Sequence, residues 1–255
     1  MPFRDKYANL RTTLASIMQL DTNMSRRNKL LCRSTLDDEI RVAPAYHTRI
    51  RDNIQIQPTT QVFNNAFHLL RLPSLTSKTR ETAFQILNRT VWTNNKAFKS
   101  RMRDNPNCER CGNPETMEHM ICECLHYAQP LWIKLGQVIT KYLNLNSIDH
   151  VPRVEYSQLN IIFNVPHPSL ILHIPDKLSR NALLILTQEI KRDIIYRRMN
   201  LPPSANQPTD PPRLTAHLNS TLQRLHSYLQ YIGLAKYAKA NQMLQKMIEI
   251  NLEGP

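Results

Sequence analysis

The chain has 255 residues, of which 41% are hydrophobic, and a formal net charge of +13 at pH 7. This composition can build a buried core and excludes an intrinsically disordered chain, and the lack of any run of about eighteen apolar residues excludes a membrane-spanning helix. With 4 glycines against 17 prolines, helices joined by proline-marked loops are favoured over a β fold rich in hairpins.

The positive charge is distributed unevenly along the chain. The formal net charge is +10 over residues 1–107, −2 over 108–151 and +5 over 152–255. The start of the chain lacks the apolar stretch of a signal peptide, so we expect an intracellular protein, nuclear or cytoplasmic. Basic chains in these compartments often bind a polyanion, which makes RNA or DNA the expected partner.

Residues 1–72 are predicted to form an N-terminal basic, partly helical region. Leu10, Leu14 and Ile17 recur at helical spacing, and a further short apolar segment begins at Val62. The pattern is weak, so the region is separated from the next segment mainly by its charge and by Pro73.

Residues 73–143 are predicted to contain a helical lead-in followed by a cysteine-rich segment. Ser77 lies near the expected N-cap of a first helix, whose apolar stripe includes Phe84. A second short helix is expected to be capped by Asn94 or Asn95, because asparagine accepts hydrogen bonds from the free N–H groups of a first helical turn.

Helical patterns and proline-rich stretches alternate in the rest of the chain. The segment "AQPLWIKLGQVITKYLNL" is amphipathic at helical spacing, whereas "NIIFNV" suggests a short strand or hairpin within a linker. The predicted order is a Pro-rich linker over 144–175, an amphipathic helix over 176–200, a second Pro-rich linker over 201–212 and a C-terminal helical tail over 213–255.

Four of the five cysteines lie within "NCERCGNPETMEHMICECLHYAQPLW", which begins at Asn107. Cys108 and Cys111 have the C-x2-C spacing of a metal-binding turn, and Gly112 follows where a left-handed residue lets the chain reverse. His119 and one further cysteine would complete a tetrahedral Zn²⁺ site. The alternative is four scattered thiols, which a reducing compartment makes less favourable than a metal site.

Two cysteines compete for the fourth ligand position. On a continuous α-helix Cys122 lies three residues after His119 and shares its face. Cys124 lies five residues after His119, about 140° around the helix, so the helix would have to loosen for it to bind. Spacing alone therefore favours Cys122 slightly and leaves both open.

The pattern C-x2-C-G, E-T-x-E-H, x4-C and a downstream Trp132 resembles the zinc-binding module that follows the reverse transcriptase domain of non-LTR retrotransposons, with most similarity to fungal elements. The resemblance covers roughly residues 70–140. It implies four metal ligands, with Cys122 as a possible substitute: Cys108, Cys111, His119 and Cys124. The expected fold is mainly α: a helical domain with a small CCHC zinc-binding module and a Pro-rich linker to a C-terminal helical region.

The cysteine-rich segment is acidic, so phosphates are expected to bind elsewhere. The best candidate is the basic run before it, where lysine and arginine can neutralise phosphates and exposed rings can stack on unpaired bases. Its residues are Arg89, Trp92, Lys96, Lys99, Arg101 and Arg103, with Phe98 between them. Two further candidates are Lys191, Arg192, Arg197 and Arg198, and Arg26, Arg27 and Lys29. The competing interpretation is that the rings are buried and the charges only solvate a surface.

The chain lacks the carboxylates that a polymerase needs to hold two metal ions. Asp37-Asp38 is the only adjacent pair of aspartates, and it lacks the flanking pattern of a polymerase palm. We therefore expect a nucleic-acid-binding module derived from the C-terminal region of a retrotransposon reverse transcriptase, without enzymatic activity. The alternative is a zinc-stapled protein–protein interaction or oligomerisation scaffold, in which the leucine-spaced segment 213–250 pairs with another helix.

Overall fold

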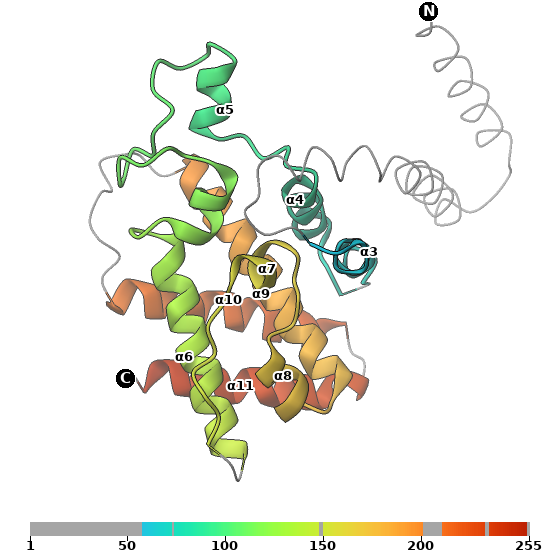
Figure 1. Ribbon diagram of the computed structural model, residues 1–255. Helices are drawn as coiled ribbons and strands as arrows, with labels where there is room; N and C mark the ends of the chain where they lie inside the picture. Colours follow the sequence, from blue (N-terminus) through green and yellow to red (C-terminus); the bar gives the residue numbers. More distant parts are fainter. Residues whose placement is uncertain (1–57, 73, 148–149, 201–210, 233–234, 254–255) are drawn as a thin grey trace, which may run out of the picture. The chain divides into compact units, whose positions relative to one another are not determined.

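The segments between Pro58 and Glu253 fold as helices that pack on one another. The computed structural model describes residues 58–253 apart from 73, 148–149, 201–210 and 233–234 (Figure 1). The predicted features in residues 1–57, including Arg26, Arg27, Lys29 and Asp37-Asp38, lie outside the described residues. The mainly helical prediction is confirmed: over the described ranges there is no strand, and one isolated β-bridge joins Asn107 to Pro114.

The described helices, labelled as in Figure 1, are α3 (Thr60–Leu69), α4 (Ser77–Leu87), α5 (Asn94–Lys99), α6 (Ala128–Asn146), α7 (Gln158–Ile162), α8 (Pro168–His173), α9 (Lys177–Asn200), α10 (Pro211–Tyr231) and α11 (Ala238–Leu252), with a π-helical turn η1 (His119–Glu123) and a 3₁₀ turn η2 (Ala235–Tyr237). None of them is both long and apolar enough to cross a membrane.

Threonines cap both short helices of the lead-in. Thr76 caps α4 by accepting a hydrogen bond from the Thr79 N–H, and Thr93 caps α5 by accepting one from the Lys96 N–H. Asn94 does not cap α5, because its side chain instead donates to the backbone carbonyl of Asn107. Both short helices exist, and Ser77 lies next to the cap of α4 as predicted, whereas the prediction that Asn94 or Asn95 caps α5 is wrong.

The core is built around α6 and α9. The apolar stripe of α6, including Leu131, Leu135 and Ile139, is buried, and α6 packs against α10, α11 and η1. Helix α9 packs against α4, α10, α11 and η1, with Leu186 and Ile190 fully buried. Both long helices therefore contact the π-helical turn that begins at His119.

The segment predicted as a linker with a strand or hairpin contains two short helices. Ser157 and Asn160 form a reciprocal capping box at the start of α7, and this local polar pairing favours a helical turn over an extended strand. Ile161 and Ile162 are buried, so part of this segment belongs to the core. The predicted strand at "NIIFNV" is wrong, because a short β-branched run is ambiguous between strand and buried helix.

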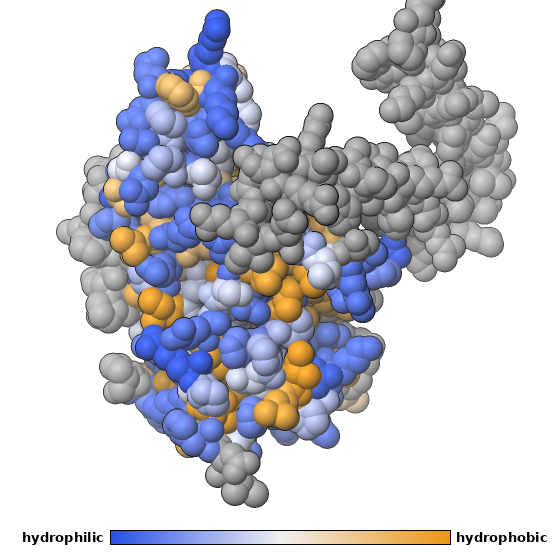
Figure 2. Space-filling model, in the orientation of Figure 1, coloured by the Kyte–Doolittle hydropathy of each residue, from blue (hydrophilic) through white to orange (hydrophobic). Residues whose placement is uncertain are grey.

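The C-terminal tail forms two helices that pack against each other and against α6 and α9. The leucine stripe of α10 is buried inside the chain: Leu218, Leu222, Leu225 and Leu229 are all at most 2% exposed. On the face that Figure 2 shows, hydrophilic residues predominate among the coloured residues, with apolar areas between them.

Candidate metal centre

Four side chains from the cysteine-rich segment converge on one point. The ligand atoms of Cys108, Cys111, His119 and Cys124 all lie within 4.8 Å of one another, and Cys111 Sγ is 3.1 Å from His119 Nε2. Three of the four residues are buried, while Cys111 is partly exposed. This group of three thiols and one imidazole can hold a single metal ion.

The first two ligands lie on a tight reversal of the chain. The Cys108 N–H donates to the Asn113 carbonyl at 2.7 Å, and the Gly112 N–H donates to the Cys108 carbonyl at 2.9 Å. Gly112 has a φ of +76°, a conformation that a side chain would strain. The β-bridge between Asn107 and Pro114 closes the base of the turn. Both sulfurs are thereby presented on one side, as the C-x2-C spacing predicts.

The π-helical turn η1 brings Cys124 into the four-residue group. The Cys124 N–H donates to the His119 carbonyl at 2.8 Å, which is the i→i+5 hydrogen bond of a π-helix. This wider turn brings Cys124 over His119, so the loosening that an ideal helix would need is present. The four ligands implied by the resemblance are the four that the structure brings together. The α-helical spacing that slightly favoured Cys122 does not apply here, because the turn is π-helical.

Cys122 is buried outside the four-residue group, and burial raises the pKa of its thiol well above the usual range. Within the group, the Cys124 thiol donates a hydrogen bond that lowers the pKa of Cys108, and the same bond raises the pKa of Cys124. Binding a metal requires the thiols to lose their protons, so acid weakens the site.

Residues around the ligands hold η1 in place. The hydroxyl of Thr116 accepts a hydrogen bond from the His119 N–H at 3.0 Å, which satisfies a free donor at the start of the turn. The indole N–H of Trp132 donates to the Ile121 carbonyl at 2.7 Å, and the ring is buried beside Tyr156. Trp132 is thus a core residue, as its place in an apolar stripe predicts, and it ties the π turn to α6.

Glu115 connects the metal segment to two helices. Its carboxylate is buried, accepts a hydrogen bond from the Asn94 N–H at 3.0 Å and forms an ion pair with Arg198 of α9 at 2.6 Å. Asn94 also donates from its side chain to the Asn107 carbonyl at 2.8 Å. The start of α5 is therefore fixed to the residues on both sides of the C-x2-C turn. Spacing revealed the ligands but gave no signal for this role of Glu115.

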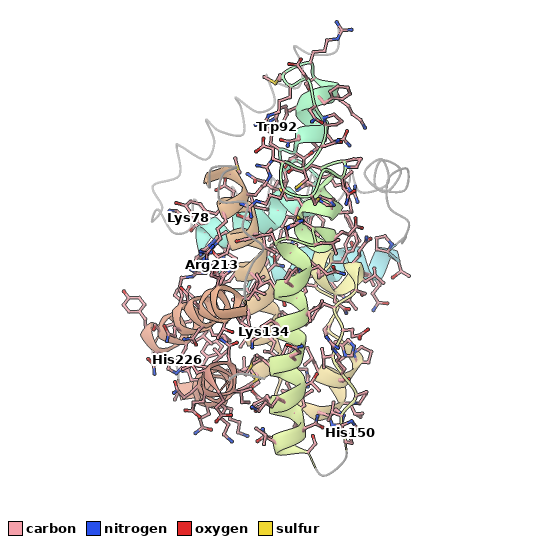
Figure 3. All side chains as sticks on the ribbon, turned by 90° about the vertical axis from the view of Figure 1, so that its left-hand side faces the viewer. Lys78, Trp92, Lys134, His150, Arg213 and His226 are labelled. Carbon is pink, nitrogen blue, oxygen red and sulfur yellow. The ribbon has the colours of Figure 1, made fainter. Side chains whose placement is uncertain are left out.

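The basic run before the metal segment divides into fixed and exposed side chains. Arg89 forms an ion pair with Glu118, and Lys96 donates to the carbonyls of Arg89 and Val91, so both are structural. Arg103 pairs with Glu109 at 2.6 Å. The remaining predicted residues of this run are exposed: Trp92, Lys99 and Arg101, together with Phe98. Figure 3 labels Trp92 beside α5.

The predicted surface on α9 is mostly internal. Lys191 is 1% exposed and donates to the Ile161 carbonyl at 2.7 Å and to Asn164 Oδ1 at 3.0 Å, so its prediction as a phosphate contact is wrong. Arg192 pairs with acidic neighbours on its own helix, Arg198 pairs with Glu115, and Arg197 is partly exposed. Helical periodicity could not separate these residues from solvated ones, because a buried lysine and an exposed lysine look alike in sequence.

Comparison of the chain with protein-family models, with curated proteins and with solved structures found no match. The resemblance to the retrotransposon module thus depends on the motif itself, and the functional argument depends on the geometry of the site.

Proposed function

We propose that this chain is a zinc-stabilised nucleic-acid-binding module, related to the module that follows the reverse transcriptase domain of non-LTR retrotransposons and without polymerase activity of its own. One observation carries the proposal: the Cys/His group is joined through Glu115 to the start of α5, whose exposed side chains are basic and aromatic. A metal that fixes the segment 108–124 would therefore also fix the helix that presents those side chains.

The donor set favours Zn²⁺ among common metal ions. Three thiolates and one imidazole suit a borderline-soft ion with tetrahedral preference, whereas Mg²⁺ and Ca²⁺ prefer oxygen ligands. With Zn–S bonds of about 2.3 Å, sulfurs in a tetrahedron lie about 3.8 Å apart. The mutual separation of at most 4.8 Å fits such a site with little adjustment. Four protein ligands close the coordination sphere, so the ion would support structure rather than carry out a reaction.

The charge around the site favours α5 over the metal group as the place where phosphates bind. Three thiolates and Zn²⁺ sum to a net negative charge, and Glu109 and Glu123 are exposed nearby. On the α5 side, Lys99 and Arg101 are exposed, as are Trp92 and Phe98 of the same segment. Basic side chains interleaved with exposed rings are typical of surfaces that bind nucleic acids.

The alternative function as an oligomerisation scaffold loses its main support. It relied on the leucine-spaced segment 213–250 pairing with another helix, but the leucine stripe of α10 is buried against α6, α9 and α11 of the same chain. A helix whose apolar face is already buried has no apolar surface left on that face for binding another helix.

The proposal is tested by measuring nucleic-acid binding with and without the metal. Fluorescence anisotropy of labelled RNA and DNA oligonucleotides would be followed for the zinc-loaded full chain and for the same chain after chelation. We expect binding that weakens on chelation and with rising salt, and that weakens in a Lys99→Ala/Arg101→Ala variant. Failure of the zinc-loaded chain to bind either RNA or DNA would overturn the proposal.

A further inference from the structure

We infer that the α5 segment, residues 91–103, recognises unpaired nucleotides, with bases stacked on Trp92 and Phe98 and phosphates held by Lys99 and Arg101. This inference rests on the proposed function and specifies its ligand: a single-stranded stretch of nucleic acid rather than a duplex.

The rings of the α5 segment are exposed although the backbone that carries them is held. Trp92 is 50% exposed and Phe98 is 44% exposed, and Met102 beside them is 71% exposed. The residues on either side of Trp92, Val91 and Thr93, are each only 3% exposed. At the α5 end of Figure 2, small apolar areas lie among hydrophilic residues. Exposed rings on a held backbone can bind a base without the cost of ordering the main chain.

The hydrogen bonds of α5 explain why its backbone is held. Thr93 caps the helix, Asn94 is bound to Glu115 and Asn107, and Ala97 is buried on the inner face. Trp92 and Phe98 therefore do not belong to the buried core. Helix α5 is anchored by one face and carries Phe98, while Trp92 lies just before the N-cap between the buried residues Val91 and Thr93.

The number of unpaired basic side chains in the α5 segment favours unpaired nucleotides over a duplex as the ligand. Within the α5 segment, Lys96 and Arg103 already have partners in the chain, whereas Lys99 and Arg101 have none among the described residues. With two free cations the α5 segment makes few phosphate contacts of its own, so stacking has to supply much of the affinity of this segment. Only unpaired bases expose their faces to a ring.

A residue with a left-handed backbone conformation follows the end of helix α5. Arg101 has a φ of +56°, a left-handed conformation that glycine usually supplies at a helix C-terminus. Its N–H donates to the Phe98 carbonyl at 2.9 Å, and the Met102 N–H donates to the Ala97 carbonyl at 2.9 Å. Arginine is unfavourable in this conformation. At this position it places a positive charge three residues after the exposed ring of Phe98.

The test uses the zinc-loaded full chain and four fluorescein-labelled probes: 15-nucleotide oligo(U), 15-nucleotide oligo(dT), an abasic phosphodiester strand of equal length and a blunt DNA duplex. We expect Trp92→Leu and Phe98→Leu each to weaken binding of the single strands by about 5- to 150-fold, the range for losing one stacked base. Trp92→Phe keeps a ring and should retain most of the affinity. Tyr231→Leu is the matched control, because Tyr231 is 87% exposed at the end of α10.

Tryptophan emission gives an independent readout of stacking. The chain has 2 tryptophans, of which Trp132 is buried, so a base stacked on Trp92 should quench the exposed component of the emission. We expect oligo(U) or oligo(dT) to quench this component and the abasic strand to leave it unchanged. For Lys99→Ala/Arg101→Ala, the slope of log affinity against log salt should become shallower by about 1.4, that is about 0.7 per phosphate contact. Arg153→Ala/Lys177→Ala removes two exposed charges elsewhere and should leave the slope unchanged.

The outcomes separate this inference from the proposed function. If no probe binds, both are overturned together. If the duplex or the abasic strand binds as tightly as the single strands, and Trp92→Leu and Phe98→Leu bind like the unaltered chain, then only the inference is overturned.

Discussion

Arg198 on α9 donates its Nε hydrogen to the buried carboxylate of Glu115, 2.6 Å away. The other carboxylate oxygen accepts a hydrogen bond from the backbone of Asn94, the first residue of α5. The Glu115 carboxylate therefore links the cysteine-rich segment to both α5 and α9. This junction explains why Arg198, predicted as a phosphate contact, is a structural residue.

Replacing Arg198 by methionine leaves the Glu115 carboxylate buried without its charge partner. Removing one member of a buried ion pair costs about 3–5 kcal/mol, because the remaining charge stays desolvated. We expect the free energy of unfolding of Arg198→Met to fall by about that amount in urea titrations at saturating zinc. Arg153→Met, at an exposed position, should change it by less than about 0.5 kcal/mol. A loss below about 1 kcal/mol for Arg198→Met would contradict the role assigned to the pair.

Gly136 lies where α6 meets the backbone of Val154. A Cβ at this position would overlap the Val154 carbonyl oxygen, and the Val154 N–H is also bound to the Thr140 hydroxyl one turn further along α6. Alanine normally stabilises a helix by up to about 1 kcal/mol relative to glycine. Here we expect Gly136→Ala to destabilise the chain by about 1–3 kcal/mol, because the two backbones must move apart.

Thermal unfolding of Gly136→Ala beside Gln137→Ala checks this expectation. Gln137 is the exposed neighbour on the same helix, so its replacement by alanine should be close to neutral. An increase in stability for Gly136→Ala would show that the close approach of α6 and Val154 does not exist in solution.

Lys191 should make stability depend on pH. Burial lowers the pKa of its ammonium group from 10.5 to about 7. Between these values the unfolded chain binds more protons than the folded chain, so the free energy of unfolding rises as pH increases. From pH 7 to pH 9 we expect the unaltered chain to gain about 2 kcal/mol relative to Lys191→Met. Urea titrations of both proteins across this range measure the difference, and parallel pH profiles would refute it.

The sequence predicts the parts of the site that depend on short spacing. The C-x2-C turn with Gly112 and the position of His119 follow from local backbone geometry, and they are found as predicted. The fourth ligand does not follow from an ideal helix, because Cys124 reaches the site through a π-helical turn closed from His119. Here the motif resemblance was informative where the helical repeat was misleading.

Side chains whose role depends on distant packing were not predictable. The long helices appear near their expected positions, since an apolar stripe specifies both the helix and its buried face. The sequence could not show that Lys191 would be buried under α7 or that Arg89 and Arg198 would pair with Glu118 and Glu115. These partners lie in loops or in segments far along the chain. No periodic pattern in the sequence indicates which charged side chains form pairs there.

The central claim is that one metal ion is held by Cys108, Cys111, His119 and Cys124, with Cys122 taking no part. Elemental analysis of the purified full chain, beside Cys122→Ser and Cys124→Ser, tests it most directly. The account predicts one zinc per chain in the unaltered protein and in Cys122→Ser, and a large loss of zinc in Cys124→Ser. Zinc lost from Cys122→Ser but kept by Cys124→Ser, or a folded unaltered chain that binds no metal at all, would contradict it.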